Sequence, residues 1–147
     1  MKAPHLLRVA APPEAFAALF AAAREAGLRL GWLELAPPQP LPSPLEAAAA
    51  HGAMRAVAVG EGRSLALKPL AGQPVLQDLL REHFLGSTAV LVWGEGGVRQ
   101  AEALEQAPRI EPQGDRWRLT AGGGGAAESL ATEALLRRLR SPLPLAP

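Results

Sequence analysis

The chain has 147 residues, a hydrophobic content of 48% and a formal net charge of +1 at pH 7. That length fits one domain of ordinary size, which buries about two thirds of the surface that its unfolded chain exposes. The small net charge gives no overall field that would attract nucleic acid or an anionic membrane, and a chain without cysteine has no disulfides, thiolate metal sites or cysteine nucleophiles.

The N-terminal residues do not resemble a signal peptide, because Pro4, His5 and Arg8 interrupt the apolar core that such a peptide needs. No later stretch offers about 18 consecutive apolar residues for a transmembrane helix. We therefore expect a soluble, cytoplasmic protein that does not bind membranes. Lys2 and Lys68 are the two lysines among 15 basic residues, and this bias toward arginine suggests a bacterial source with a GC-rich genome.

The first third of the chain predicts a strand, a helix and a second strand. An apolar run at 6–10 leads into a proline-rich helix entry, and the helix should end near Gly27, the expected C′ residue. Its apolar stripe comprises Phe16, Leu19, Phe20 and Ala23. The second strand is expected at 28–35, where we interpret Gly31 as a packing gap filled by Trp32.

The segment at 36–44 contains five prolines and is interpreted as a rigid connection. It leads into a capping box, with Ser43 as N-cap and Glu46 at N3. This pattern predicts a short, alanine-rich helix that ends at Gly52.

Residues 54–94 carry the clearest pattern in the chain, and we expect the rest of the fold to be organised around them. Runs at 56–59 and 64–67 predict a β-hairpin, and the helical spacing that follows predicts an amphipathic helix ending at Gly86. The unbroken apolar run at 88–93 is typical of a strand covered on both faces. We expect nearly complete burial of Val57, Val59, Leu79, Val90, Leu91 and Val92.

The last third predicts a helix at 98–107 and a second hairpin at 110–120. A Gly114-Asp115 loop would set Ile110 opposite Leu119, whereas a Gln113-Gly114 loop would set it opposite Trp117; we favour the former, because glycine is preferred first in type II′ loops. A flexible glycine run at 122–125 and a final helix from Ser129 should follow.

Together these elements predict an α/β fold: a single domain over residues 1–140, with a mixed sheet of about five to seven strands, helices packed on it and two β-hairpins. Residues 141–147 should form a flexible C-terminal tail.

The best candidate binding site is the loop after the central strand, at Gly94, Gly96, Gly97 and Arg99. A strand that leads into a glycine loop before a helix presents backbone N–H groups to an anion. The match is partial, since the third glycine of a dinucleotide fingerprint is replaced by Arg99, and Glu95 places a negative charge in the loop. A plain tight turn is the competing interpretation.

No other residues form a catalytic or metal-binding pattern. The three histidines are far apart, the serines lie in no nucleophile elbow, and Asp78 and Asp115 are the two aspartates. We interpret His83 as a partly buried, hydrogen-bonded side chain. We therefore predict no catalytic residue, no metal and no cofactor, and leave open whether the protein is an enzyme.

Basic residues near the first hairpin could form a patch with Arg99, but no aromatic side chains accompany them, which disfavours nucleic acid as a partner. They are Arg55, Arg63 and Lys68.

Two functions remain open. The leading hypothesis is a non-catalytic protein that acts through self-association or partner binding. We expect a homodimer, because the apolar stripes of the first and last helices should not all find cover in one small domain. The alternative is an enzyme that binds a small anionic molecule or a nucleotide phosphate at the Gly94–Arg99 loop.

Overall fold

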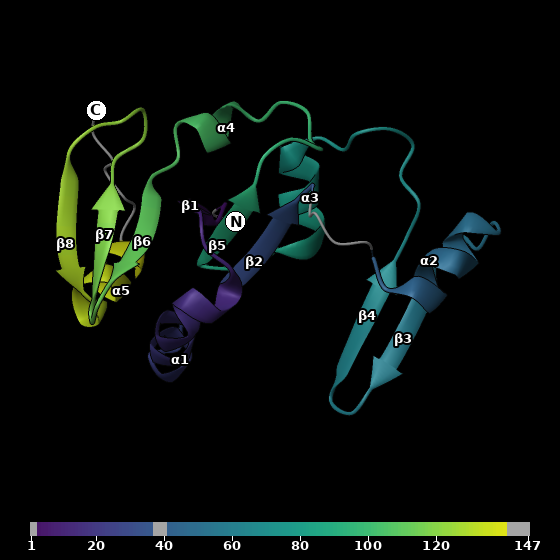
Figure 1. The fold of residues 1–147 in the computed structure, drawn as a ribbon, viewed down its shortest axis with the longest axis horizontal. Coiled ribbons are helices and arrows are strands. Elements are labelled where there is room, and N and C mark those ends of the chain that lie inside the picture. Colours follow the sequence, from purple (N-terminus) through teal and green to yellow (C-terminus); the bar gives the residue numbers. More distant parts are fainter. Residues whose placement is uncertain (1–2, 37–40, 141–147) are drawn as a thin grey trace. The chain divides into compact units, whose positions relative to one another are not determined.

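The computed structural model describes residues 3–36 and 41–140, so the expected tail at 141–147 and most of the proline-rich segment lie outside the described residues. The chain divides into two compact units (Figure 1). The main unit comprises Met1–Ala36 with Val75–Pro147, and the hairpin unit comprises Pro37–Pro74. The expectation of one domain over residues 1–140 concerns how these units combine, and it stays a prediction.

The main unit is built on a six-stranded mixed sheet in the order β2-β5-β1-β6-β7-β8. Neighbours are parallel from β2 to β6 and antiparallel from β6 to β8. The predicted α/β fold with a mixed sheet is confirmed. The strands are β1 (His5–Val9), β2 (Leu30–Leu35), β5 (Ala89–Gly94), β6 (Arg109–Gln113), β7 (Arg116–Thr120) and β8 (Ala127–Ala131).

Helices cover both faces of this sheet. A 3-10 turn, η1 (Pro13–Phe16), leads into α1 (Ala17–Glu25), which shares one buried cluster with α5 (Thr132–Arg140). On the opposite face, α3 (Leu76–His83) and the single turn α4 (Glu102–Glu105) form the second cluster. As expected, Gly27 takes the C′ position after α1, following the C-cap Ala26, and has a φ of +74°.

Strand β5 lies between β1 and β2 and is buried on both sides. Ala89 and Leu91 belong to one buried cluster, whereas Val90 and Val92 belong to the other. This alternation explains why the run carries no polar residue, since neither face of the strand meets water. The predicted burial of Val90, Leu91 and Val92 is confirmed.

The packing gap at Gly31 is filled by a different side chain from the one expected. A Cβ on Gly31 would lie 2.6 Å and 2.7 Å from Cδ1 and Cε1 of Phe84, so it is the Phe84 ring that occupies the space. Trp32 lies beside the aromatic side chains of the α1 face, with its ring centre 6.1 Å from that of Phe16. Gly31 and Trp32 are neighbours in β2, so the Trp32 side chain points to the face of the sheet opposite the one on which Phe84 covers Gly31.

Helix α3 buries a narrower stripe than its sequence predicts. Leu76 and Leu80 are 2% and 4% exposed, and Phe84 continues this line one turn later. Leu79 is half-buried, so the expectation that it would be almost fully buried is wrong. A short helix packed on a sheet buries one line of i, i+4 residues, and Leu79 lies beside that line.

The hairpin unit contains α2 (Ser43–Ala50) and the antiparallel pair β3 (Ala56–Gly60) and β4 (Arg63–Leu67). The predicted hairpin is confirmed, but the expected burial of Val57 and Val59 is wrong, since they are 54% and 80% exposed. Ala56 and Leu45 of α2 are buried instead. A helix whose last four residues are alanine covers little of a hairpin, and α2 lies at the end of the strands away from the turn (Figure 1).

The second hairpin follows the favoured register. Ile110 pairs with Leu119, and Gly114 takes a φ of +62° at the first loop position. The glycine run at 122–125 is the connection to a third strand rather than a flexible linker, and the N–H of Ala121 donates to the carbonyl of Ala126 across it.

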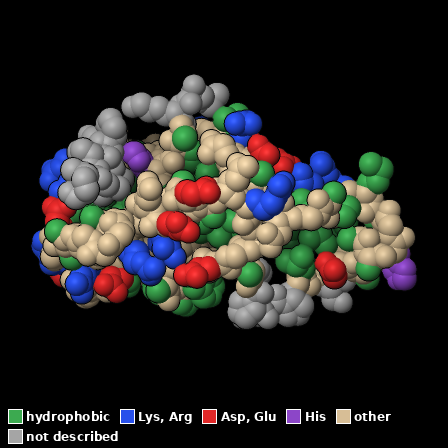
Figure 2. Space-filling model, turned by 90° about the horizontal axis from the view of Figure 1, so that it is seen from above, with side chains coloured by type: hydrophobic (Ala, Val, Ile, Leu, Met, Phe, Trp, Pro, Cys, Tyr) green, Lys and Arg blue, Asp and Glu red, His purple; other side chains and the backbone are tan. Residues whose placement is uncertain are grey.

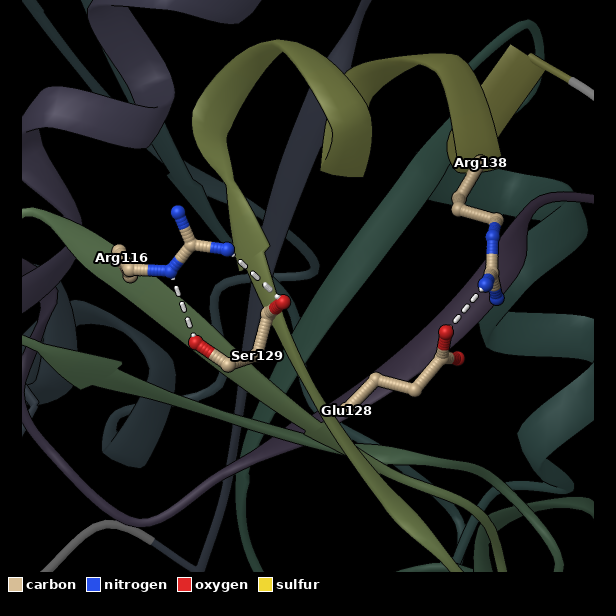
Figure 3. A network of polar contacts seen from close by, with 4 residues as sticks. All are labelled: Arg116, Glu128, Ser129 and Arg138. Carbon is tan, nitrogen blue, oxygen red and sulfur yellow. Dashed lines mark hydrogen bonds and ion pairs between the residues drawn. The ribbon is translucent and has the colours of Figure 1, made fainter.

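Strand β8 was not expected from the sequence, which predicts a helix from Ser129. Arg116 of β7 donates to the Ser129 hydroxyl at 2.9 Å and to its carbonyl at 3.0 Å, and Arg138 of α5 contacts Glu128 (Figure 3). Trp117 also donates from Nε1 to Thr132 Oγ1, at 2.9 Å, where α5 begins. Partners on a neighbouring strand and on the following helix therefore extend the sheet into a segment with weak strand propensity.

Candidate functional site

The predicted loop lies at the point where a ligand would be expected in an open α/β sheet. Strands β1 and β5 are parallel neighbours, yet the chain leaves β1 toward β2 at one edge and leaves β5 toward β6 on the other side. The connection after β1 passes over β5 on the α1 face, and the connection after β5 passes over β1 on the α4 face, so the two leave on opposite faces of the sheet. In open α/β sheets, ligands bind outside the carboxyl ends of the strands. The Gly94–Arg99 loop follows β5 at this edge.

Backbone packing requires glycine at position 94. Its φ is +98°, and a Cβ at this position would collide with the carbonyl oxygen of Leu35, at the end of β2. Gly96 and Gly97 also have positive φ angles, of +84° and +74°, but a Cβ on Gly96 would meet no atom within 4 Å. The close approach of β2 to β5 therefore accounts for Gly94 without a ligand, and a turn conformation accounts for the other two.

Arg99 is held through its backbone at the start of α3. Its carbonyl accepts a hydrogen bond of 3.0 Å from the N–H of Leu76, and it forms an isolated parallel bridge with Val75. The expected helix at 98–107 is reduced to α4, whose first residue is Glu102. The expectation of a longer helix is wrong, because this segment is instead paired with the chain before α3.

A cavity of about 190 Å³ lies at this edge of the main unit. Two of the four predicted residues, Gly94 and Gly96, line it, whereas Gly97 and Arg99 do not. The other lining residues are Arg8, Glu95, Val98, Ala101, Leu104 and Glu105.

The charges around this cavity are not those of an anion site. The guanidinium of Arg8 makes an ion pair with Glu95 across 3.0 Å, so its charge is already matched by a carboxylate. Glu105 adds a second carboxylate to the lining, and Glu102 and Glu105 occupy the single turn of α4. An anionic ligand would have to displace or neutralise these groups. Anion binding at Gly94, Gly96, Gly97 and Arg99 stays a prediction, without support from a helix N-terminus.

Apolar side chains are exposed mainly on the hairpin unit. Within the described residues, six of the seven exposed large hydrophobic side chains belong to this unit, and the seventh is Leu85. We call Val57 and Val59, which lie on one face of the hairpin, the apolar hairpin surface; they are 54% and 80% exposed. Leu65, which is 48% exposed, pairs with Ala58 and therefore lies on the opposite face. The other three are Leu41, Met54 and Leu70.

Sequence reasoning missed this surface because alternating valine and alanine in a strand normally marks a buried face. The signal that could have revealed it is the composition of the neighbouring helix. Leu45 is its one large apolar residue and its last four residues are alanines, so α2 offers too little side-chain volume to cover both strands.

Within the described residues, the structure shows no cluster of side chains that could hold a metal ion. No group of three or more His, Cys, Asp or Glu side chains converges there. The side chain of His83 is 50% exposed, with Nε2 lying 3.9 Å from Glu82 Oε2, so the interpretation of a partly buried histidine is wrong. Ser129 is engaged by Arg116 in the sheet.

The basic residues considered as a patch belong to different units. Arg55, Arg63 and Lys68 lie in the hairpin unit and Arg99 in the main unit. Basic and acidic side chains are interspersed across the face shown in Figure 2. In the described part of the chain, no helix combines the length and apolar character that crossing a membrane would require.

No protein-family model matches the chain, and no curated protein is significantly similar to it in sequence. Among solved structures, the chain is similar to "The Crystal structure of Bacillus subtilis MobB", with a TM-score of 0.42 and 18% sequence identity. The similarity covers 61% of this chain and 60% of that chain, so the chain spans less than two thirds of that protein's length. The α/β assignment rests on the strand order and pairing described above.

Proposed function

We propose that this is a non-catalytic, cytoplasmic protein that acts by binding a second copy of itself through the hairpin unit. The observation that carries the proposal is the apolar hairpin surface, Val57 and Val59. A two-stranded hairpin with one short helix is marginally stable in water, and it gains stability when a further surface covers its apolar side chains.

The structural feature that supports self-association is not the one that the sequence predicts, namely exposed apolar stripes on the first and last helices. The buried residues of α1 and α5 lie in a single cluster of the main unit, so these helices find cover within the chain. The exposed apolar side chains lie instead on the hairpin unit. Closed two-fold association is the commonest way for a soluble protein to cover such side chains.

Sedimentation equilibrium over a range of micromolar concentrations tests the proposal. We expect a monomer–dimer equilibrium for the wild-type chain. The Val57→Thr/Val59→Thr double variant keeps β-branched side chains but removes apolar surface, and it should raise the dissociation constant at least about tenfold.

The matched control is Leu85→Thr, because Leu85 is 62% exposed but belongs to the main unit. This variant should dimerise like the wild type. A single species near the chain mass of 15.3 kDa at every concentration would contradict the proposal.

A second candidate, an enzyme or binding protein for a small anionic molecule, rests on the position of the cavity at the end of β5 and not on its charges. The cavity lies outside the carboxyl end of β5, and two non-glycine residues near this edge, Ala36 and Gln100, have positive φ angles of 48° and 54°. Strained backbone of this kind concentrates at functional sites.

A thermal-shift screen with inorganic phosphate, nucleotides and sugar phosphates tests this candidate, since a ligand that binds the native state raises its stability. A hit should be weakened by Arg8→Gln and strengthened by Glu105→Gln, because these changes remove opposite charges from the cavity lining. The same hit with unchanged affinity in both variants would place the ligand elsewhere.

A further inference from the structure

We propose that two copies of the chain join edge to edge through β3, antiparallel, with the two-fold axis at Ala58. This inference rests on the proposed self-association and specifies its geometry. It would extend the two-stranded sheet of one copy into a four-stranded sheet in the order β4-β3-β3-β4. Three observations lead to it: the unpaired edge of β3, the residues whose backbone groups point outward, and the charges at the two ends of the strand.

Among the described residues, the hairpin sheet consists of β3 and β4, so each strand has one edge without a strand partner in that sheet. Gly60 and Arg63 flank a two-residue loop and form the pair that closes the turn. Hydrogen-bonded and non-hydrogen-bonded pairs alternate from there, so the N–H and C=O groups of Val57 and Val59 point away from β4. A strand added at this edge would bond to these two residues.

Nothing within β3 discourages such pairing. Proteins protect exposed edges with charged residues, proline or bulges, and the sequence of β3, AVAVG, contains no charge or proline. Val57, Ala58 and Val59 are all exposed. By contrast, β4 begins with Arg63 and is followed by Lys68.

The charged residues that flank β3, Arg55 before its first residue and Glu61 in the loop after its last, select one register. With the axis at Ala58, Val57 lies opposite Val59 of the second copy, and Arg55 lies opposite Glu61 of the second copy. An axis at Val57 would place Arg55 opposite Val59, and an axis at Val59 would place Glu61 opposite Val57. Opposite charges facing each other across strands stabilise a pair, so the axis at Ala58 is favoured.

The alternative edges lack this complementarity. Pairing β4 with itself about Leu65 would set Arg63 opposite Leu67, an apolar residue. Pairing β3 of one copy with β4 of another would be a head-to-tail contact, which leaves further edges open and leads toward filaments. Of these three arrangements, β3 with β3 is the one that both closes the assembly and matches its charges.

The chain has no cysteine, so a single introduced cysteine reports on this interface directly. In the proposed geometry, Ala58 of one copy lies opposite Ala58 of the other in a non-hydrogen-bonded pair, with the two Cα atoms about 4.5 Å apart. This distance lies within the range of disulfides, about 4.4–6.8 Å. Under mild oxidation at micromolar concentration, Ala58→Cys should form a covalent dimer. Ser64→Cys, exposed on β4, is the matched control and should stay monomeric on denaturing gels.

Charge exchange provides an independent test. Arg55→Glu and Glu61→Arg should each weaken the homodimer several-fold, because like charges would then face each other. An equimolar mixture of the two variants should form heterodimers, since the two acidic side chains at these positions of one chain would face the two basic side chains of the other. The double exchange should restore the homodimer.

The outcomes separate this inference from the proposed function. If the wild type dimerises but Ala58→Cys does not cross-link and the charge variants behave like the wild type, then the β3 edge is wrong and self-association stands. If the wild type and every variant remain monomeric, both proposals fail. Cross-linking at Ala58 together with heterodimer formation would establish the interface.

Discussion

At the scale of single residues, glycine marks the places where another part of the backbone or a ring comes too close for a side chain. Gly94 faces the carbonyl of Leu35, and Gly31 lies under Phe84. These contacts explain two glycines that the sequence alone associates with a ligand site or a packing gap. They also lead to two predictions, one for each glycine, and each is compared with a variant at a second position of the chain.

Gly94→Ala should lower the free energy of unfolding by about 3 kcal/mol or more, because the added Cβ meets fixed backbone and the φ of +98° is unfavourable for alanine. Gly96→Ala has the same conformational cost but open space around the added Cβ, so it should lose about 1–2 kcal/mol. Urea denaturation of both variants measures the difference. Equal losses would mean that the approach of Leu35 is not what requires glycine.

Gly31→Ala should cost about 1–3 kcal/mol by overpacking against the Phe84 ring. In a Phe84→Ala background the same substitution should cost much less, since the ring that it meets is gone. A double-mutant cycle in chemical denaturation gives the coupling between the two sites. Additive effects would show that the ring moves away freely and that Gly31 is not required by Phe84.

At the scale of elements, the sheet decides which side of each helix is buried. The sequence of α3 offers two adjacent leucines, and the structure buries Leu80 while leaving Leu79 half-exposed. The order of the strands likewise provides β8 with a partner in β7. The local sequence pattern indicates that a helix or strand forms, and the neighbouring elements determine which of its faces is buried and where it ends.

Leu80→Ala should destabilise the protein by about 2–5 kcal/mol, because Leu80 is 4% exposed and its removal leaves a cavity against β5. Leu79→Ala should cost less than half as much, since part of that side chain already meets water. Thermal or urea unfolding of the two variants checks the order. A larger loss of stability for Leu79→Ala than for Leu80→Ala would mean that Leu79, and not Leu80, lies on the buried face of α3.

At the scale of the whole molecule, the two units differ in what stabilises them. The main unit has helices on both faces of its sheet, whereas the hairpin unit pairs two strands with one alanine-rich helix. The stability of a segment against local opening follows the apolar surface that it buries. The two units should therefore open independently.

Amide hydrogen exchange should reveal this difference. In dilute solution the β5 amides should be the slowest to exchange, and the β3 and β4 amides should exchange much faster. Raising the protein concentration should slow exchange in β3, because the dimer protects its outward N–H groups, and this should not occur in Val57→Thr/Val59→Thr. Exchange in β3 as slow as in β5 at every concentration would contradict the independence of the hairpin unit.

Much of the fold follows from the sequence alone. The α/β class, both hairpins, the register at Ile110 and Leu119, and the double-sided burial of β5 are all local: they follow from hydrophobic period, turn glycines and runs without polar residues. The position of the candidate loop after an interior strand is confirmed for the same reason.

Tertiary structure decided the rest. Val57 and Val92 look alike in sequence, yet Val92 has a helix packed over it and Val57 does not. Burial of a strand residue depends on which other parts of the chain pack against that face of the strand. The local hydrophobic period of the sequence does not contain this information. The charges at the Gly94–Arg99 loop are of the same kind, because Arg8 and Glu95 are 87 residues apart and meet only when β1 pairs with β5. Strand order also turned Ala127–Ala131 into an edge strand, since pairing with β7 outweighs its weak propensity.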